Sequence, residues 1–192
     1  MQLKWGMHKN SKDSLHAPAE VDTILKQVFG LTEFRGVQRA VIDSVLKGQD
    51  QLVLMPTGMG KSLCYQLPAR VLGGLTVVIS PLIALMKDQV DAARKIGLRA
   101  TFINSTLSRE ERELRQRKLQ GGAFELLYVT PERFRKPEFC EAILTQKIKL
   151  FAVDEAHCIS EWGHNFRPEY RNLSTLKTLF PGIPLIALTA TA

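Results

Sequence analysis

The sequence contains no long apolar run. Among its 192 residues, apolar side chains never continue for the roughly 18 positions that a membrane-spanning helix needs. The first 20 residues are polar and mixed in charge, and Asp13 and Glu20 are unusual for a transit peptide. A secretory signal and a membrane anchor are therefore not indicated, and we expect the protein inside a cell.

Cysteine is scarce and unevenly spaced. Cys64, Cys140 and Cys158 form no Cys-x-x-Cys pair, and an odd number of cysteines does not suit a disulfide framework. Reduced thiols are the expectation. His157, Cys158 and His164 are three potential metal ligands, but there is no fourth ligand at zinc-like spacing. No zinc site is expected in this chain.

Repeats and low-complexity tracts are also lacking, and the length suits one well-buried domain. Residues 1–18 have no apolar periodicity, so we expect a flexible leader followed by a domain over 19–192. The net charge of +7 and the pI near 9.5 suit a polyanionic partner, although the excess of positive charge is moderate.

Short apolar segments alternate with helical patterns along the chain. Helices are expected over 21–28, 37–45, 61–72, 82–96 and 108–119, and strands over 51–55, 75–79, 99–103, 125–129, 150–153 and 185–188. Strands that are apolar throughout and separated by helices are typical of a parallel sheet covered on both faces. The pattern predicts an α/β, doubly wound domain with six or seven strands.

The first expected strand leads into a phosphate-binding pattern, Pro56-Thr57-Gly58-Met59-Gly60-Lys61-Ser62. Glycines let backbone N–H groups turn inward and cradle phosphate oxygens at the start of a helix. Lys61 is expected between the β- and γ-phosphates of ATP, and the Ser62 hydroxyl on Mg²⁺. Met55 occupies the position of the pattern's first glycine, but the positions that touch phosphate are kept.

Two carboxylates follow the apolar strand that ends at Val153. Asp154 and Glu155 come at the carboxyl end of this strand, where ligands bind in open α/β sheets. Asp154 is expected to hold Mg²⁺ through water, and Glu155 to orient or deprotonate the attacking water. His157 is expected to link this site to its surroundings by hydrogen bonds.

Several runs together resemble the motifs of superfamily-two helicases, and more specifically those of the RecQ family of DNA helicases. They are Phe29–Gln38 (motif 0), Met55–Ser62 (motif I), Val77–Val90 (motif Ia), Tyr128–Glu132 (motif Ib), Asp154-Glu155-Ala156-His157 (motif II, a DEAH box), Ser160–Tyr170 (the aromatic-rich loop) and Ala187–Ala192 (motif III). Motif I is common to many nucleotide-binding proteins. Motif 0 and the aromatic-rich loop are far more specific.

The resemblance implies a RecA-like fold and assigns roles to matching residues. Gln38 would read the adenine edge of ATP, Arg35 would stack on the base, and Leu31 would pack against it. The DNA-binding and coupling positions would be Pro81, Leu82, Thr130, Pro131, Glu132, Trp162, His164, Phe166, Arg167, Thr189 and Thr191. Aromatic side chains stack on bases irrespective of sequence. From the residues alone, however, Trp162 and Phe166 would equally suit an ordinary core.

Two features limit the resemblance. The family's loop usually has an aspartate where this sequence has Asn165, which would weaken any ion pair that orients the loop. The charged helix over 109–118 offers a rival basic patch, but its Glu110, Glu111 and Glu113 favour a solvated face.

The family implies an ATP-dependent helicase that moves 3′ to 5′ on single-stranded or forked DNA in repair and recombination. It would work in the bacterial nucleoid or the eukaryotic nucleus. The sequence stops after motif III, so we expect the N-terminal motor lobe without the second lobe, its arginine finger, or the zinc-binding and winged-helix modules. Weak ATP–Mg²⁺ binding, little hydrolysis and no unwinding are expected of this chain. An RNA helicase or duplex translocase, and a nucleotide-gated DNA-binding module, are the alternatives.

Overall fold

The protein is built on a single parallel β-sheet of six strands. The computed structural model describes residues 18–159, 173 and 175–191. Across the sheet, the strands lie in the order β1-β6-β5-β2-β4-β3, and every pairing is parallel. The strands are β1 (Gln51–Leu54), β2 (Leu75–Ile79), β3 (Ala100–Ile103), β4 (Leu126–Val129), β5 (Ile148–Val153) and β6 (Leu185–Thr189).

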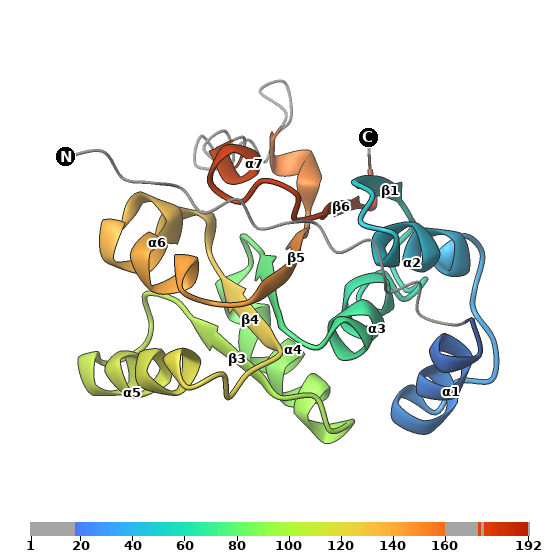
Figure 1. Ribbon diagram of the computed structural model, residues 1–192, viewed down its shortest axis with the longest axis horizontal. Helices are drawn as coiled ribbons and strands as arrows, with labels where there is room; N and C mark the ends of the chain where they lie inside the picture. Colours follow the sequence, from blue (N-terminus) through green and yellow to red (C-terminus); the bar gives the residue numbers. More distant parts are fainter. Residues whose placement is uncertain (1–17, 160–172, 174, 192) are drawn as a thin grey trace.

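Helices cover both faces of this sheet (Figure 1). The helices of one face are α2 (Gln38–Leu46), α3 (Leu63–Leu72) and α4 (Ile83–Lys95), and those of the other are α5 (Arg109–Gln120), α6 (Pro137–Leu144) and α7 (Leu176–Leu179). The helix α1 (Pro18–Phe29) packs outside α2 and α3 through Val21 and Leu25. The short 3₁₀ helices η1 (Pro131–Arg135) and η2 (Ala156–Ile159) follow β4 and β5.

The apolar strands divide their side chains between two cores, because successive residues of a strand point to opposite faces. In β2, Val78 packs under α3 and α4, while Val77 and Ile79 pack on the face of α5 and α6. The edge strand β1 differs. Its Val53 is buried, but Leu52 and Leu54 on the opposite face are 79% and 57% exposed.

The fold predicted from the sequence is confirmed, with boundaries that mostly agree within one or two residues. Ser62 and Ser108 precede α3 and α5 as N-cap residues rather than belonging to the helices. Pro18 is the first residue of α1, and residues 1–17 lie outside the described part. The sequence pattern predicted neither α6, whose eight residues begin at Pro137, nor the four-residue α7. None of the described helices has the length and apolar character required to cross a membrane.

Candidate nucleotide and nucleic-acid site

The residues singled out from the sequence gather at one edge of the sheet. All strands are parallel, so their carboxyl ends share this edge. The phosphate loop after β1, Asp154 after β5 and Thr189 in β6 stand on three neighbouring strands at one end of it. Pro81 after β2 and Thr130 after β4 stand on the next two strands. Nucleotide and nucleic-acid candidates thus occupy adjacent halves of one edge.

The phosphate loop joins β1 to α3 with two glycines in left-handed conformation. Gly58 has φ +80° and Gly60 has φ +76°, values that side chains rarely permit. Met55 has no positive φ and is 3% exposed, which explains why this position accepts a methionine in place of glycine. The backbone N–H of Met55 donates to the carbonyl oxygen of Thr189 (3.0 Å), so β6 anchors the start of the loop.

Lys61 folds back over this loop. Its Nζ donates to the carbonyl oxygen of Met55 at 3.2 Å. The ammonium therefore lies over the loop, where the carbonyl takes the place that a phosphate oxygen would occupy. Thr57 and Gly58 are exposed, as are Pro56 and Gly60, so the loop presents its backbone to solvent.

Gln38 lies beneath the phosphate loop rather than at the surface. It is 2% exposed, and its Nε2 donates to the carbonyl oxygens of Met59 (3.0 Å) and Gly60 (3.1 Å). The backbone N–H of Arg35 donates to its Oε1 (2.7 Å). All the amide's donors and its acceptor are thus engaged within the chain. Leu31 and Arg35 are exposed, so reading adenine would require Gln38 to exchange bonds that now hold the loop.

Asp154 is buried at the end of β5, 8% exposed. Burial raises the pKa of its carboxyl group, and the neighbouring Glu155 raises it further. The backbone N–H of Glu155, which donates to Asp154 Oδ1 at 3.0 Å, together with Lys61 and a hydrogen bond from Gln89, opposes this rise in pKa. The carboxylate is therefore a buried charge that a bound cation would stabilise.

The donor set around Asp154 fits Mg²⁺. Burial raises the pKa of Tyr65, with additions from Tyr128 and then Asp154, whereas a hydrogen bond with Ser62 lowers it. Tyr65 thus interacts with both Ser62 and Asp154, the two predicted metal ligands. A carboxylate and a hydroxyl oxygen are hard ligands of the kind that Mg²⁺ prefers.

Glu155 and His157 connect the acidic turn to β6. Glu155 has φ +51°, the only positive φ at a non-glycine position in the described chain. Nδ1 of His157 lies 3.2 Å from Glu155 Oε2 and 3.2 Å from Thr189 Oγ1. Thr189 Oγ1 donates to the carbonyl oxygen of Thr191 (2.7 Å), so Nδ1 of His157 is the donor to Thr189. Glu155 is thus joined through His157 to Thr189, which in turn contacts Thr191.

The expected DNA-contacting residues differ in accessibility. Pro81, Thr130 and Pro131 are buried, whereas Leu82 is 38% exposed and Glu132 is partly exposed. Pro81, Thr130 and Pro131 could therefore contact a strand only through backbone atoms and the Thr130 hydroxyl. The aromatic-rich loop candidates Trp162, His164, Asn165, Phe166 and Arg167 lie outside the described residues. Among the described residues, no three His, Cys, Asp or Glu side chains gather as a metal site.

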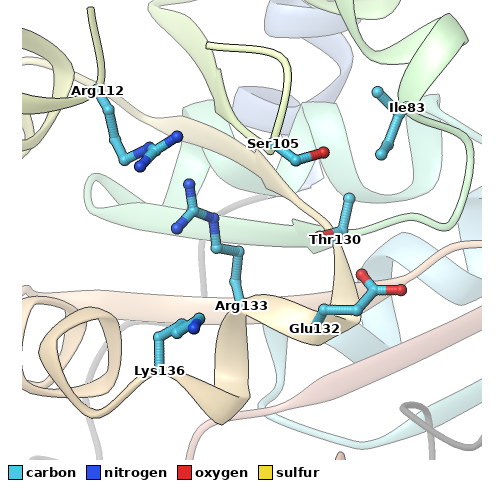
Figure 2. Close-up of a pocket in the computed structure, with 7 residues that line it drawn as sticks. All are labelled: Ile83, Ser105, Arg112, Thr130, Glu132, Arg133 and Lys136. Carbon is cyan, nitrogen blue, oxygen red and sulfur yellow. The ribbon is translucent and has the colours of Figure 1, made fainter. Parts of the chain in front are cut away.

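Beside Thr130 lies a cavity of about 420 Å³ that sequence reasoning missed (Figure 2). Its lining residues are Ile83, Ser105, Arg112, Thr130, Glu132, Arg133 and Lys136.

The charged side chains of α5 were expected on a solvated face. This prediction is confirmed for Arg109, which pairs with Glu113, but is wrong for Arg112 and Arg115. Arg115 lies over the Phe102 ring at 4.2 Å, and Arg112 turns into the cavity. Helical charge spacing alone does not show which cations turn inward.

Comparison with known proteins identifies the class. The DEAD/DEAH box helicase family model matches residues 35–192, and the chain belongs to this family. The chain is 54% identical over 170 residues to the ATP-dependent DNA helicase RecQ of Haemophilus influenzae, covering 88% of this chain and 28% of that protein. It is 49% identical over 172 residues to RecQ of Bacillus subtilis, covering 88% and 29%. The chain thus spans less than a third of the length of these relatives.

Solved structures of lower identity share the fold. A hypothetical ATP-dependent RNA helicase from Sulfolobus tokodaii superposes with a TM-score of 0.66 at 20% identity, over 91% of this chain and 51% of that one. The DUF1998 helicase MrfA bound to DNA and AMPPNP gives 0.67 at 19% identity, over 89% and 26%. At these identities, the likeness shows the RecA-like fold alone and no role.

Proposed function

We propose that this chain is the ATP-binding motor lobe of an ATP-dependent DNA helicase, which couples Mg²⁺–ATP hydrolysis to movement 3′ to 5′ along single-stranded DNA. The observation that carries the proposal is the hydrogen-bonded connection from the phosphate loop through Thr189 and His157 to Glu155. The similarity to RecQ helicases over 88% of the chain supports DNA as the nucleic acid.

In this proposal, Mg²⁺ would be held by Ser62 and Asp154, and would neutralise charge on the phosphates of ATP. Lys61 would exchange the Met55 carbonyl for phosphate oxygens. Glu155 would hold and orient the attacking water and accept its proton, while His157 fixes the position of the carboxylate. A second motor lobe would supply an arginine finger, which contributes on the order of 10³–10⁵ in rate.

The DNA half of the edge would respond to this chemistry through α4. Gln89 in α4 joins the helix after Pro81 and Leu82 to Asp154. A change at Asp154 on nucleotide binding would therefore reach the residues proposed to touch the DNA backbone. Location in a nucleoid or a nucleus, and roles in repair and recombination, belong to the same proposal.

Calorimetric titration of the chain with ATP and Mg²⁺ tests the nucleotide site. Lys61→Ala is expected to weaken binding at least tenfold, because a charge-assisted contact to phosphate is lost. Lys95→Ala is the matched control, since Lys95 is exposed at the far end of α4. Equal affinities of wild type and Lys61→Ala would refute the site assignment.

One alternative is an RNA helicase, which is the activity for which the Sulfolobus neighbour is named. Binding of single-stranded DNA and RNA of the same length and sequence, with ATP present, separates the two. Tighter binding to RNA would replace the DNA proposal. The other alternative is a nucleotide-gated DNA-binding module. It predicts DNA affinity that changes with ATP while hydrolysis stays absent even when a second lobe is supplied.

A further inference from the structure

Ser62, the hydroxyl residue of the phosphate loop, does not cap the helix that it precedes. It is the N-cap residue of α3, a position at which a serine hydroxyl usually accepts a hydrogen bond from a backbone N–H of the first turn. Here its φ of −60° and ψ of −31° are helical, and its side chain makes no capping bond. The backbone N–H groups of Tyr65 and Gln66 donate to the Ser62 carbonyl oxygen instead, at 3.2 Å and 2.9 Å. The Ser62 hydroxyl is therefore available for another role.

Two buried tyrosines join α3 to β4 through their hydroxyl groups. Tyr65 of α3 and Tyr128 of β4 are 1% and 0% exposed, and their rings meet edge to face with centroids 6.3 Å apart. The two Oη atoms lie 3.4 Å apart, and Nε2 of Gln66 donates to Tyr128 Oη at 3.3 Å. Because both hydroxyl groups are buried, we expect them to form their hydrogen bonds within the protein.

The hydrogen bonds of the tyrosine pair run in one direction, away from Ser62. Burial raises the pKa of both phenols, so each keeps its proton at neutral pH and has one hydrogen to donate. Hydrogen bonds with Tyr65 and Gln66 lower the pKa of Tyr128, which identifies the Tyr128 oxygen as the acceptor of both. The bond with Ser62 lowers the pKa of Tyr65 and the bond with Tyr128 raises it, so Tyr65 accepts from Ser62 and donates to Tyr128.

Building on the proposed function, we propose that Tyr65 is a positioning residue for the cation: its oxygen accepts the hydroxyl hydrogen of Ser62 and so leaves the lone pairs of the Ser62 oxygen for Mg²⁺. A hydroxyl group binds a cation through a lone pair, and a partner outside the metal site that takes its hydrogen fixes its orientation. Tyr128 stabilises this arrangement, because it accepts the hydrogen of Tyr65 and is itself held by Gln66.

Packing alone does not require these two hydroxyl groups. Replacing both partners of a buried hydrogen bond by apolar groups of the same shape can be nearly neutral in stability, so two phenylalanines would fill the space between α3 and β4 as well. Asp154, the other predicted metal ligand, adds to the rise that burial causes in the pKa of Tyr65 and of Tyr128. The hydroxyl pair therefore belongs to the surroundings of both predicted metal ligands.

Calorimetric titration with ATP, once with Mg²⁺ and once with a chelator, measures how much the cation tightens nucleotide binding. Tyr65→Phe is expected to reduce this tightening about tenfold, the lower end of the effect of removing a partner that orients a metal ligand. ATP affinity in chelator should stay unchanged, since Lys61 and the loop backbone are untouched. Tyr128→Phe should reduce the tightening by about threefold, because Tyr65 loses a hydrogen bond but still accepts from Ser62.

Melting temperatures of the ligand-free variants separate positioning from general destabilisation. Tyr65→Phe and Tyr128→Phe each remove two hydrogen bonds, so their melting temperatures should fall by similar amounts, although only the first variant removes the acceptor of Ser62. A merely structural role would give both variants the same Mg²⁺ effect.

Two further variants serve as controls. Thr76→Val removes a buried hydroxyl that has no partner among the described residues, and it should leave the Mg²⁺ effect unchanged. In a Ser62→Ala background, Tyr65→Phe should cause no further loss of the Mg²⁺ effect, because no hydroxyl remains to be oriented.

Four results would overturn the assignment. The first is an unchanged Mg²⁺ effect in folded Tyr65→Phe, or in Tyr128→Phe if Tyr65→Phe does not fold. The second is a further loss in the Ser62→Ala background, and the third is an equal loss of ATP affinity with Mg²⁺ and with chelator, which would assign Tyr65 to the folding of the loop. The fourth is ATP binding by wild type that Mg²⁺ does not tighten. It would also refute the cation site of the proposed function, whereas ATP binding that depends on Lys61 would preserve its nucleotide site.

Discussion

Nε2 of Gln38 lies 3.1 Å from the carbonyl oxygen of Gly60, and this hydrogen bond fastens α2 to the phosphate loop. A Cβ added at Gly60 would approach that same nitrogen to 2.7 Å. Only glycine therefore allows both the left-handed turn and the Gln38 contact. The Gln38 amide and the phosphate loop position each other, so a substitution in one should change the conformation of the other.

Gly60→Ala is accordingly expected to destabilise the protein more than left-handed strain alone would. Gly48→Ala is the control, because Gly48 has the same φ of +76° and no atom within 4 Å of the added Cβ. Strain costs roughly 1–2 kcal/mol at either position. Displacing Gln38 should cost a further ~1–3 kcal/mol at Gly60, since buried donors lose their partners. Urea denaturation measures the difference. Equal losses would mean that Gln38 moves aside freely.

Asp154→Asn is expected to stabilise the protein at neutral pH while it weakens binding of Mg²⁺–ATP. Because burial raises the pKa of Asp154 in the folded state, the folded state binds this proton more tightly than the unfolded state does. Stability from this group is then present at low pH and is lost as pH rises through the window that begins near 3.8. The ionised carboxylate thus costs stability at pH 7.

Thermal melts at pH 7.5 and near pH 4 test this sign. The gain for Asp154→Asn at pH 7.5 should fall in the range of about 0.5–2 kcal/mol typical of single stabilising substitutions. It should shrink at the lower pH, because a larger fraction of the wild-type carboxyl is then protonated. Added Mg²⁺–ATP should stabilise wild type more than the variant. A wild type that melts higher at pH 7.5 without ligand would contradict the prediction.

Glu155, whose carboxylate we propose to orient the attacking water, has a left-handed backbone with φ +51°. Glu155→Gly and Glu155→Ala both remove the carboxylate and its contact with His157, but only glycine relieves the backbone. Glu155→Gly should therefore be more stable than Glu155→Ala by about 1 kcal/mol, the reverse of the usual order in regular structure. Chemical denaturation of the pair gives this difference directly. A more stable alanine variant would show that the turn relaxes.

Two buried threonines should respond oppositely to the same substitution. The Thr189 hydroxyl bonds both His157 and the Thr191 carbonyl, whereas the Thr76 hydroxyl is buried without a partner in the described structure. Thr189→Val should cost about 1 kcal/mol or more, and Thr76→Val should be neutral or stabilising. Melting temperatures test both. In a complete motor, Thr189→Val should also lower DNA-stimulated hydrolysis.

The sequence by itself determined the elements and the chemistry at their ends. The apolar, β-branched run Leu75–Ile79 predicted a buried strand, and Gly58 and Gly60 predicted a turn with positive φ angles. These signals are local, because periodicity and turn chemistry act within a few residues. The prediction that Lys61 and Asp154 lie in one site followed from the same local patterns, because the carboxyl ends of parallel strands share one edge of the sheet.

Tertiary structure alone decided which distant side chains meet. Strand order places β4 between β2 and β3, and this order brings Arg133 of η1 against Arg112 of α5 to form the basic cavity. Likewise, packing of α2 buries Gln38 under the loop, although its sequence position suits an exposed helix start. The spacing of charged and amide residues in the sequence shows which of them share a helix face. It does not show which element packs against that face, because this depends on the order of the strands and on the connections between them.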